Sequence, residues 1–266
     1  MEVLVLASGS SGNSVLVRSG GTAVLVDLGV SALQLKKRLE CFGCTPDDVD
    51  AIFLTHEHSD HIRGLEVFLR RHREAPVWTT RGTWSRVPVK TRTGGEIETG
   101  RDYPVGSLRV RPVATSHDAA EPVAYVFEDG LQRVAVCTDT GIFTHLLEQR
   151  LANCDLLLIE TNHDADMLRH GPYPWQLKQR IASRLGHLAN HQTEEALDRI
   201  KCSQLKGVVG LHLSAENNST QLATDSLRRA MNGSCPAVAV PRTEMLRVTV
   251  GATAIFETVP IPAKGF

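Results

Sequence analysis

The feature that most constrains this chain is a cluster of potential metal ligands directly after a short apolar run. His56, His58, Asp60 and His61 fall within six residues and follow the apolar residues 51–54. In an extended segment that leaves a strand, side chains two residues apart point the same way, so His56 and His58 can hold one ion together. Asp60 and His61 begin the next helical pattern and can reach a second ion a few ångströms away. The spacing predicts a dinuclear metal site rather than a closed structural zinc site, which would more often use Cys.

Length and charge set the outer limits. A chain of 266 residues can bury a full core, and nothing resembles a low-complexity linker, so we expect one domain over residues 1–266. Lys plus Arg number 29 and Asp plus Glu number 30, so an anionic substrate must be attracted locally. The chain begins on an alternating apolar strand pattern without a basic leader, and no apolar run reaches membrane-spanning length. We therefore expect a cytoplasmic protein with no membrane partner, of unknown oligomeric state.

The six cysteines are scattered, which favours reduced thiols with no disulfide partner. Cys41 and Cys44 form a C-x-x-C pair, which can be redox-active or half of a zinc site. The pair lies at the end of a helical pattern, with Gly43 as a plausible C-cap and no second pair elsewhere. These features favour a purely structural role.

Hydrophobic periodicity predicts strands and helices that alternate through much of the chain. Residue Asp27 ends one strand pattern and could either orient a ligand histidine or cap the helix that begins near Ser31. Thr193 is the expected N-cap of a later helix. We expect strands at 2–6, 15–18, 23–26, 51–54, 96–98, 108–113, 123–128, 133–136, 155–159 and 207–211, helices at 31–41, 62–72, 173–185, 193–201 and 221–230, and a β-rich tail.

Three further candidate ligands each follow a strand pattern. His117 would complete a three-histidine set with His56 and His58. Asp139 could bridge both ions, and His212 is the ligand that the second ion still needs. An isolated His or Asp at a strand end is usually a cap or turn residue, but beside the first cluster each supplies what that cluster lacks.

One stretch of the chain, residues 70–92, is strongly basic. It contains two tryptophans, Trp78 and Trp84, and one acidic residue, Glu74. Beside the metal site it could follow a phosphate backbone, with Trp84 available for stacking. The alternative is a solvated helix end followed by a surface loop. Its cations are Arg70, Arg71, Arg73, Arg81, Arg86, Lys90 and Arg92.

The order of these ligands resembles the metal signature of the metallo-β-lactamase fold. Residues 8–13, 160–164 and 186–190 resemble more closely its YycJ/WalJ-type branch, bacterial hydrolases assigned as DNA exonucleases or phosphodiesterases. The resemblance spans nearly the whole chain. It implies an α/β (α+β) fold, a four-layer αβ/βα sandwich in which two mixed β-sheets pack face to face between outer helices, with the metals at one edge.

The resemblance also implies how the ligands divide. His56, His58 and His117 would hold one divalent ion, Asp60, His61 and His212 the other, and Asp139 both. We expect Zn²⁺ or Mn²⁺ ahead of Fe²⁺. His61 argues against the antibiotic-cleaving members, and the 73 residues from Asp139 to His212 are too few for the inserted domain of β-CASP nucleases.

In the implied mechanism a water bridging the ions becomes a hydroxide that attacks phosphorus in line. Asp60 could orient that water and accept its proton. His187, in a Gly-His-Leu segment that resembles the proton-donor loop of tRNA-maturing relatives, could serve as general acid or be a surface histidine. The acidic partner of that donor would fall near Val136, so we expect no intact dyad. Candidate substrate contacts are Asn13, Asn162, His163, Asn190 and Ser214.

Three functions fit this sequence. The first is a dinuclear-metal phosphodiesterase acting on DNA, in particular an exonuclease, which the motifs and the basic stretch favour. The second is a hydrolase of small esters, thioesters or lactones, which the near-neutral charge permits. The third is a metal-binding regulatory protein without turnover, which a complete ligand set argues against.

Overall fold

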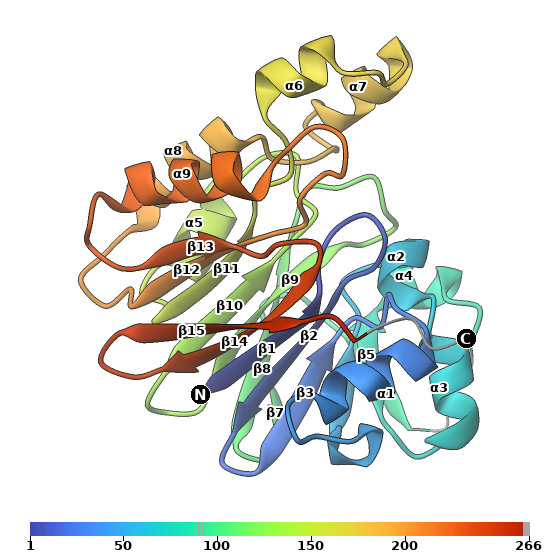
Figure 1. Cartoon of the computed structure of the whole chain (residues 1–266). Coiled ribbons are helices and arrows are strands. Elements are labelled where there is room, and N and C mark those ends of the chain that lie inside the picture. Colours follow the sequence, from blue (N-terminus) through green and yellow to red (C-terminus); the bar gives the residue numbers. More distant parts are fainter. Residues whose placement is uncertain (90, 92, 263–266) are drawn as a thin grey trace.

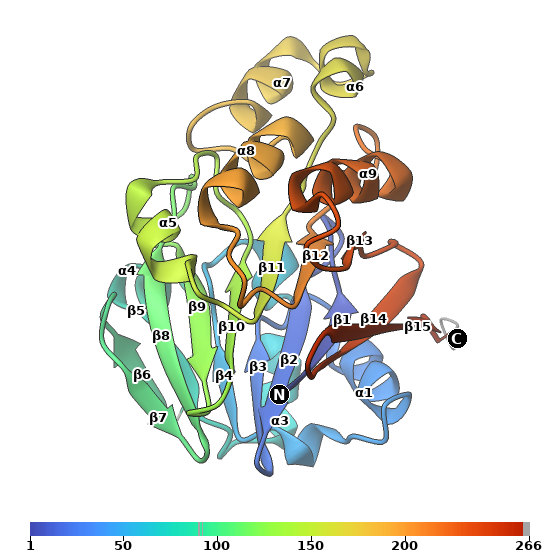
Figure 2. The same ribbon diagram turned by 90° about the vertical axis from the view of Figure 1, so that its left-hand side faces the viewer.

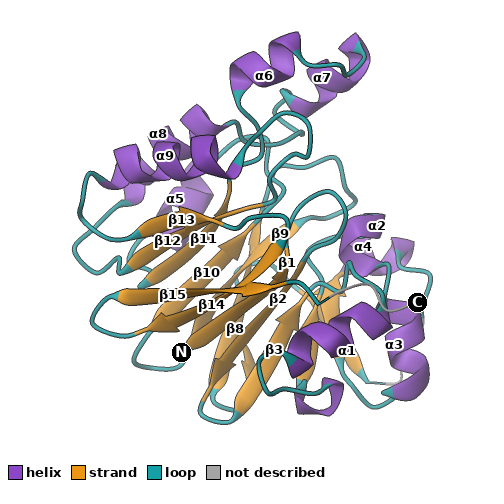
Figure 3. Ribbon diagram, in the orientation of Figure 1, coloured by secondary structure: helices purple, strands orange, loops and turns teal. Residues whose placement is uncertain are grey.

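Two β-sheets pack face to face, and helices cover both outer faces (Figure 1). The computed structural model describes residues 1–89, 91 and 93–262. Coloured by secondary structure, the strands form the interior layers and the helices lie outside them (Figure 3). The four-layer αβ/βα sandwich expected from the sequence is confirmed. Within the described ranges, no helix is long and apolar enough to cross a membrane.

The first sheet has the strand order β15-β14-β1-β2-β3-β4-β5-β6. From β15 to β3 the pairs are antiparallel, and from β3 to β6 they are parallel. Helices connect the parallel strands, as such crossovers require. The strands are β1 (Glu2–Ala7), β2 (Ser14–Ser19), β3 (Thr22–Val26), β4 (Ala51–Phe53), β5 (Val77–Thr80), β6 (Gly94–Ile97), β14 (Glu244–Val250) and β15 (Ala254–Pro260). The helices between them are α1 (Ala32–Glu40), η1 (Pro46–Asp48), α2 (Ser59–Ile62), α3 (Leu65–Arg71) and α4 (Arg81–Arg86).

The second sheet has the order β13-β12-β11-β10-β9-β8-β7. It starts as an antiparallel meander and becomes parallel from β10 to β13. The strands are β7 (Tyr103–Val105), β8 (Leu108–Ala114), β9 (Val123–Glu128), β10 (Arg133–Cys137), β11 (Leu156–Glu160), β12 (Gly207–Leu211) and β13 (Ala237–Ala239). The helices are α5 (His145–Leu151), α6 (Ala165–His170), α7 (Trp175–Ile181), α8 (Asn190–Ile200) and α9 (Thr220–Met231).

Three apolar layers hold the sandwich together. Between the sheets, Phe53 of β4 meets Tyr125 of β9 edge to face, with ring centroids 5.4 Å apart. Leu35 of α1 lies in the layer outside the first sheet, and Leu197 of α8 in the layer outside the second. The central parallel strands are buried on both faces, which explains why they read as continuous apolar runs in the sequence.

Three predicted helices differ from those observed. The helix expected at 62–72 is divided into α2 and α3 at Gly64, where a Cβ would lie 2.0 Å from the carbonyl oxygen of Val30. The helix expected at 173–185 is shorter, ends at Ile181 and is preceded by α6, which was missed. Thr193 is not an N-cap, because α8 already begins at Asn190 and the Thr193 hydroxyl donates to the carbonyl of Glu160 at 2.7 Å.

Several loops meet at one edge of the sandwich. The parallel strands β10, β11 and β12 run the same way, so their carboxyl ends share an edge. Turned by 90°, the structure has α6 and α7 beyond the edge at which β11 ends (Figure 2). All six cysteines are free thiols.

Candidate metal centre

The seven predicted ligands lie together at this edge, although they come from both sheets. The loop with His56, His58, Asp60 and His61 follows β4, and His117 follows β8. Asp139 and His212 come after β10 and β12. Ligand atoms within 4.8 Å of one another form four overlapping groups: His56, His58 and His117; His56, His61 and Asp139; Asp60, His61 and His212; and Asp139, Glu160, His187 and His212.

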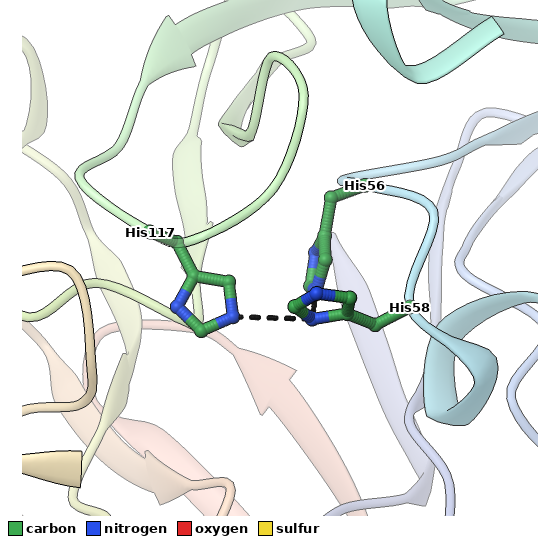
Figure 4. A group of neighbouring side chains, drawn as sticks. All are labelled: His56, His58 and His117. Carbon is green, nitrogen blue, oxygen red and sulfur yellow. Dashed lines mark hydrogen bonds between the residues drawn. The ribbon is translucent and has the colours of Figure 1, made fainter. Parts of the chain in front are cut away.

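The first group consists of three imidazoles that point toward one another (Figure 4). His58 Nδ1 lies 3.0 Å from His56 Nε2 and 3.3 Å from His117 Nε2. The outward nitrogen of His117 donates to the carbonyl of Gly186 at 3.0 Å, which leaves its Nε2 lone pair facing the group. Three nitrogen atoms at this spacing can share one divalent ion.

Asn13 joins the members of the group made of Asp60, His61 and His212. Its amide nitrogen lies 3.2 Å from Asp60 Oδ2 and 3.0 Å from His61 Nε2, while its oxygen accepts from His212 Nδ1 at 3.0 Å. The rings of His61 and His212 are stacked with centroids 5.9 Å apart. One carboxylate and two imidazoles therefore face a common space.

Asp139 lies between the two groups. Its Oδ2 is 3.3 Å from His61 Nε2, and its Oδ1 is 3.4 Å from His212 Nε2 and 3.8 Å from His117 Nε2. The carboxylate is buried, and no hydrogen-bond partner for Oδ2 is present among the described residues. A buried oxygen without a donor is costly unless something else satisfies it. This carboxylate fits an arrangement in which it bridges two cations.

Asp27 fixes the orientation of His61. Its Oδ2 accepts from His61 Nδ1 at 2.7 Å and from the Thr55 hydroxyl at 2.8 Å, and its Oδ1 accepts from the Thr55 amide at 2.8 Å. The cap of α1 is Ser31, whose hydroxyl accepts from Gln34 at 3.2 Å. Of the two roles considered for Asp27, the contact to a ligand histidine is the one observed.

The charges of the cluster favour the cation-binding form at His56 and Asp139 and the protonated form at His61. Burial and the neighbouring imidazoles, His61 foremost, hold the pKa of His56 well below 6.5, so that ring is neutral. Burial opposes ionisation of Asp139, but the charges of His212 and His61 outweigh it and bring its pKa well below 3.8. Burial also lowers the pKa of His61, yet Asp139 and Asp27 raise it well above 6.5. Cation binding would therefore release a proton from His61.

His187 has a carboxylate partner that the sequence did not reveal. Its Nδ1 donates to Glu160 Oε1 at 2.7 Å and lies 3.5 Å from Asp139 Oδ1. Burial lowers the pKa of His187, but the charge and hydrogen bond of Glu160 and the charge of Asp139 outweigh burial and raise it to about 9. Position 136 is a valine, as noted from the sequence, but His187 has a carboxylate partner at the end of β11 instead, so the histidine–carboxylate pair is present with a different acidic residue.

The five predicted substrate contacts are all buried and support the loops of the cluster. Asn162 donates to the carbonyl of His212 at 2.8 Å, and the Ser214 hydroxyl accepts from Asn217 at 3.2 Å. Asn190 pairs with Asn218, a residue that the sequence did not single out. A direct contact of Asn13, Asn162, His163, Asn190 or Ser214 with substrate stays a prediction.

The basic stretch does not present a stacking surface. Trp78 lies in β5 and stacks on Phe53 at 6.3 Å, and Trp84 packs against the apolar layer under α1 and α3. Arg70 pairs with Glu66 at 2.6 Å. Lys90 and Arg92 lie outside the described residues. The stretch includes the end of α3, the strand β5 and the helix α4, so it is not the helix end and surface loop of the alternative interpretation, although its described arginines are exposed.

Comparison with known proteins agrees with the fold. The model of the β-lactamase superfamily domain matches residues 22–212. The chain belongs to this superfamily and is a metal-dependent hydrolase.

Within the superfamily the chain is similar to two curated bacterial proteins. One is the exodeoxyribonuclease YycJ of Bacillus anthracis, 34% identical over 237 residues that cover 85% of this chain and 88% of that protein. The other is the exodeoxyribonuclease WalJ of Streptococcus pneumoniae, 37% identical over 226 residues that cover 82% and 84%. The solved structure of the metallo-β-lactamase fold protein YhfI from Bacillus subtilis superposes with a TM-score of 0.71, at 19% identity, over 92% of this chain and 98% of that one.

Proposed function

We propose that this chain is a dinuclear-metal phosphodiesterase that degrades DNA as an exonuclease. The observation that carries the proposal is the Asp139 carboxylate, which lies between two ligand groups with one buried oxygen unpartnered within the described chain. His56, His58 and His117 would hold one ion, Asp60, His61 and His212 the other, and Asp139 both. We infer one domain over residues 1–266, since both sheets contribute ligands to this centre.

Paired divalent ions, Zn²⁺ or Mn²⁺ ahead of Fe²⁺, would supply Lewis acidity for water and for the phosphate oxygens. The residues present fit them, because their donors are imidazole nitrogens and carboxylate oxygens. Four of the ligand histidines use their outward nitrogen in a fixed contact: His56 with Thr55, His61 with Asp27, His117 with Gly186 and His212 with Asn13. Such contacts lock the tautomer that binds a cation.

Asp60 is the residue that we assign to orient the attacking water and accept its proton. Burial raises its pKa, but the hydrogen bond and charge of His61 and the charge of His212 outweigh burial, so the pKa lies below its ordinary value. The carboxylate is therefore ionised at neutral pH. Its side chain keeps 20% of its surface exposed, so unlike Asp139 it can contact a water in the open part of the centre.

His187 is the residue that we assign to protonate the leaving oxygen of the sugar. A pKa of about 9 keeps the ring protonated at neutral pH, and its Nε2 carries the proton to be donated. Glu160 positions the ring. Its Oε2 accepts from the amides of Thr140 at 2.9 Å and Leu188 at 3.2 Å, which fixes the carboxylate itself.

DNA as substrate is supported by the names of the two similar proteins, both exodeoxyribonucleases. The test is a time course with linear double-stranded DNA labelled at one end, in the presence of Mn²⁺ or Zn²⁺. We expect mononucleotides or short products from linear DNA, no cleavage of closed circular DNA, and loss of activity in Asp60→Ala. Asp47→Ala, which changes a side chain 85% exposed on η1, serves as the matched control.

A different outcome would reject the proposal. If the metal-loaded protein leaves DNA, RNA and bis-p-nitrophenyl phosphate intact but opens a lactone or a thioester, the chain is a small-molecule hydrolase. Cleavage of closed circular DNA would instead identify an endonuclease.

A further inference from the structure

The α6–α7 pair carries a tryptophan that the sheets do not use. Trp175 opens α7 and keeps 68% of its surface exposed, whereas Trp78 and Trp84 pack against the apolar layers. In both ribbon views α6 and α7 project from the body of the sandwich beyond α8 (Figure 1, Figure 2). A large exposed indole is unfavourable in water and is typical of a binding surface.

Trp175 lines a groove of about 530 Å³ between the α6–α7 pair and the start of α8. We call it the Trp175 groove. Leu168 and Ala189 make part of its wall apolar, while the cations Arg169 and Lys178 and the imidazoles His163 and His191 supply its polar side. The described residues that line the groove include no carboxylate. A groove of this size and composition suits a planar, anionic ligand.

The groove shares a wall with the candidate metal centre. His163 forms an isolated parallel bridge with Ala189, and the amide of Asn190 donates to the carbonyl of His163 at 2.8 Å. Ala189 lies two residues after His187. A ligand in the Trp175 groove therefore contacts the same short segment that carries the assigned proton donor.

A second connection ties the pair to the other side of the centre. Arg180 Nε donates to Asp118 Oδ2 at 2.5 Å, and Asp118 Oδ1 lies 3.4 Å from the ring of the ligand His117. The amide of Asp118 donates to the carbonyl of Leu185 at 3.0 Å. The α6–α7 pair is thus fastened to both loops that flank the metal centre.

The charge of the pair favours an anion. Between residues 163 and 187 four basic side chains stand against two aspartates, Asp164 and Asp166. Arg169 pairs with Asp166 at 3.2 Å, but both side chains are at least 70% exposed, so the pair is weak and a phosphate can replace it. Lys178 donates to the carbonyl of Arg169 at 2.8 Å, and no described carboxylate lies within 4.0 Å of its amine.

We propose that the Trp175 groove binds an unpaired nucleotide of the DNA strand whose neighbouring phosphate is cut at the metal centre. The indole of Trp175 stacks on the base, and Lys178 and Arg169 face the phosphates on either side of it. Stacking on an aromatic ring accepts any base, which suits an enzyme that advances along a strand. This inference rests on the proposed function, since it names a binding site for the same substrate.

The first test measures binding without cleavage. A labelled single-stranded oligonucleotide is titrated against the whole protein in the presence of a chelator. Trp175→Ala should weaken binding roughly 5- to 100-fold, the range that loss of one base–aromatic stack produces, while Trp175→Phe should keep most of the affinity. Leu131→Ala is the matched control, because Leu131 is 90% exposed in the turn between β9 and β10. Equal affinity in Trp175→Ala and Leu131→Ala would overturn the inference.

Salt dependence tests the cations. Arg169→Gln should reduce the slope of log affinity against log salt concentration by about 0.7, the value for one phosphate contact on a single strand. Arg101→Gln is the control, because Arg101 is 68% exposed and has the same kind of i,i+3 pair, with Glu98 at 3.4 Å. An unchanged slope in Arg169→Gln would show that Arg169 does not contact a phosphate of the bound strand.

A cleavage assay separates this inference from the proposed function. In Trp175→Ala, the loss of kcat/KM on DNA should exceed any loss on bis-p-nitrophenyl phosphate, which has no base to stack. If the wild-type protein cuts DNA and Trp175→Ala lowers kcat/KM equally on both substrates, the groove inference is wrong. The proposed nuclease function is then unaffected. If the wild-type protein cuts no DNA, the proposed function is wrong, and the binding titration still decides the groove.

Discussion

Replacing His187 by Ala tests the assigned proton donor most directly. The imidazole lies 3.5 Å from Asp139 and is held by Glu160 at 2.7 Å, so its removal deletes a donor at the edge of the metal centre without removing an assigned metal ligand. The leaving oxygen of a DNA strand is a poor leaving group and needs a proton. The nitrophenolate of bis-p-nitrophenyl phosphate leaves readily without one. The two substrates should therefore respond differently.

The expected size of the effect follows from general acid catalysis, which contributes about 10²- to 10⁴-fold. We expect His187→Ala to lower kcat on DNA by that factor and kcat on bis-p-nitrophenyl phosphate by less than about tenfold. Glu160→Gln should act in the same direction. This substitution should also lower the free energy of unfolding. Glu160 accepts hydrogen bonds from three donors, and the NH₂ group of the glutamine side chain must face one of them. An unsatisfied buried group costs about 1–3 kcal/mol, which lowers Tm.

The pH profile gives an independent readout. The pKa of His187 is raised to about 9 chiefly by Glu160, so the protonated donor is present below that pKa and lost as pH rises through it. Cations bound beside Asp139 lower this pKa, so the alkaline limb on DNA should lie below pH 9. Glu160→Gln removes the negative charge that raises the pKa of His187, so the alkaline limb of the pH profile should move to lower pH.

The assay compares kcat on a labelled oligonucleotide and on bis-p-nitrophenyl phosphate for both variants. His145→Gln is the control, because His145 on α5 is a 79% exposed histidine that also pairs with a glutamate, Glu148 at 3.2 Å. If His187→Ala loses equally on both substrates, the histidine supports the site and does not donate a proton. The role assigned to His187 would then be rejected.

Three further predictions concern the cluster and its surroundings. Asp27→Asn weakens the bond that orients His61, so divalent-cation affinity should fall about 10- to 100-fold in a competitive metal titration. Removal of the cations by a chelator should lower Tm. Adding the cation back at 100 times its Kd should raise the free energy of unfolding by about 2.7 kcal/mol per site. Burial lowers the pKa of His163 to about 4. As pH falls below 6.5, His163 is therefore protonated in the unfolded chain but stays neutral in the folded chain, which destabilises the folded state. Between pH 7 and pH 4 the free energy of unfolding should therefore fall by up to about 3 kcal/mol less in His163→Gln than in the wild-type protein, measured by urea unfolding.

The clustering of the seven candidate ligands could be predicted because their signal is local. Four lie in one short loop, and the others each end a strand whose apolar pattern is visible in the sequence. The two sheets follow from the same alternation, since strands buried on one or both faces leave a clear apolar pattern. Strands such as β6, which begins with two glycines, and short helices such as α4 leave a weaker pattern, and their bounds were missed or shifted.

The remaining contacts could not be predicted because they join segments far apart in the chain. Glu160 and His187 are 27 residues apart, and only the return of the chain through α6 and α7 brings them to 2.7 Å. A strand that ends in a buried glutamate is the one signal that pointed to this residue. Trp175 gave no signal, because a tryptophan at the start of a helical pattern is as often buried as exposed. Trp84 was preferred because it lies in the basic stretch, but it packs against an apolar layer.

Positive φ angles mark residues whose side chain is kept although glycine would fit the backbone conformation better. Five described residues other than glycine have positive φ. Two are asparagines, of which Asn232 has the left-handed conformation typical of a helix C-cap, so the local turn explains it. The other three, Asp27, Asp139 and His212, follow β3, β10 and β12 and belong to the metal cluster or hold it. Each left-handed residue costs about 1–3 kcal/mol, which glycine would avoid. Glycine would relieve the strain at each position but remove the carboxylate or imidazole, so the sandwich must hold these strand ends rigidly enough to keep Asp139 and His212 beside each other and Asp27 on the outward nitrogen of His61.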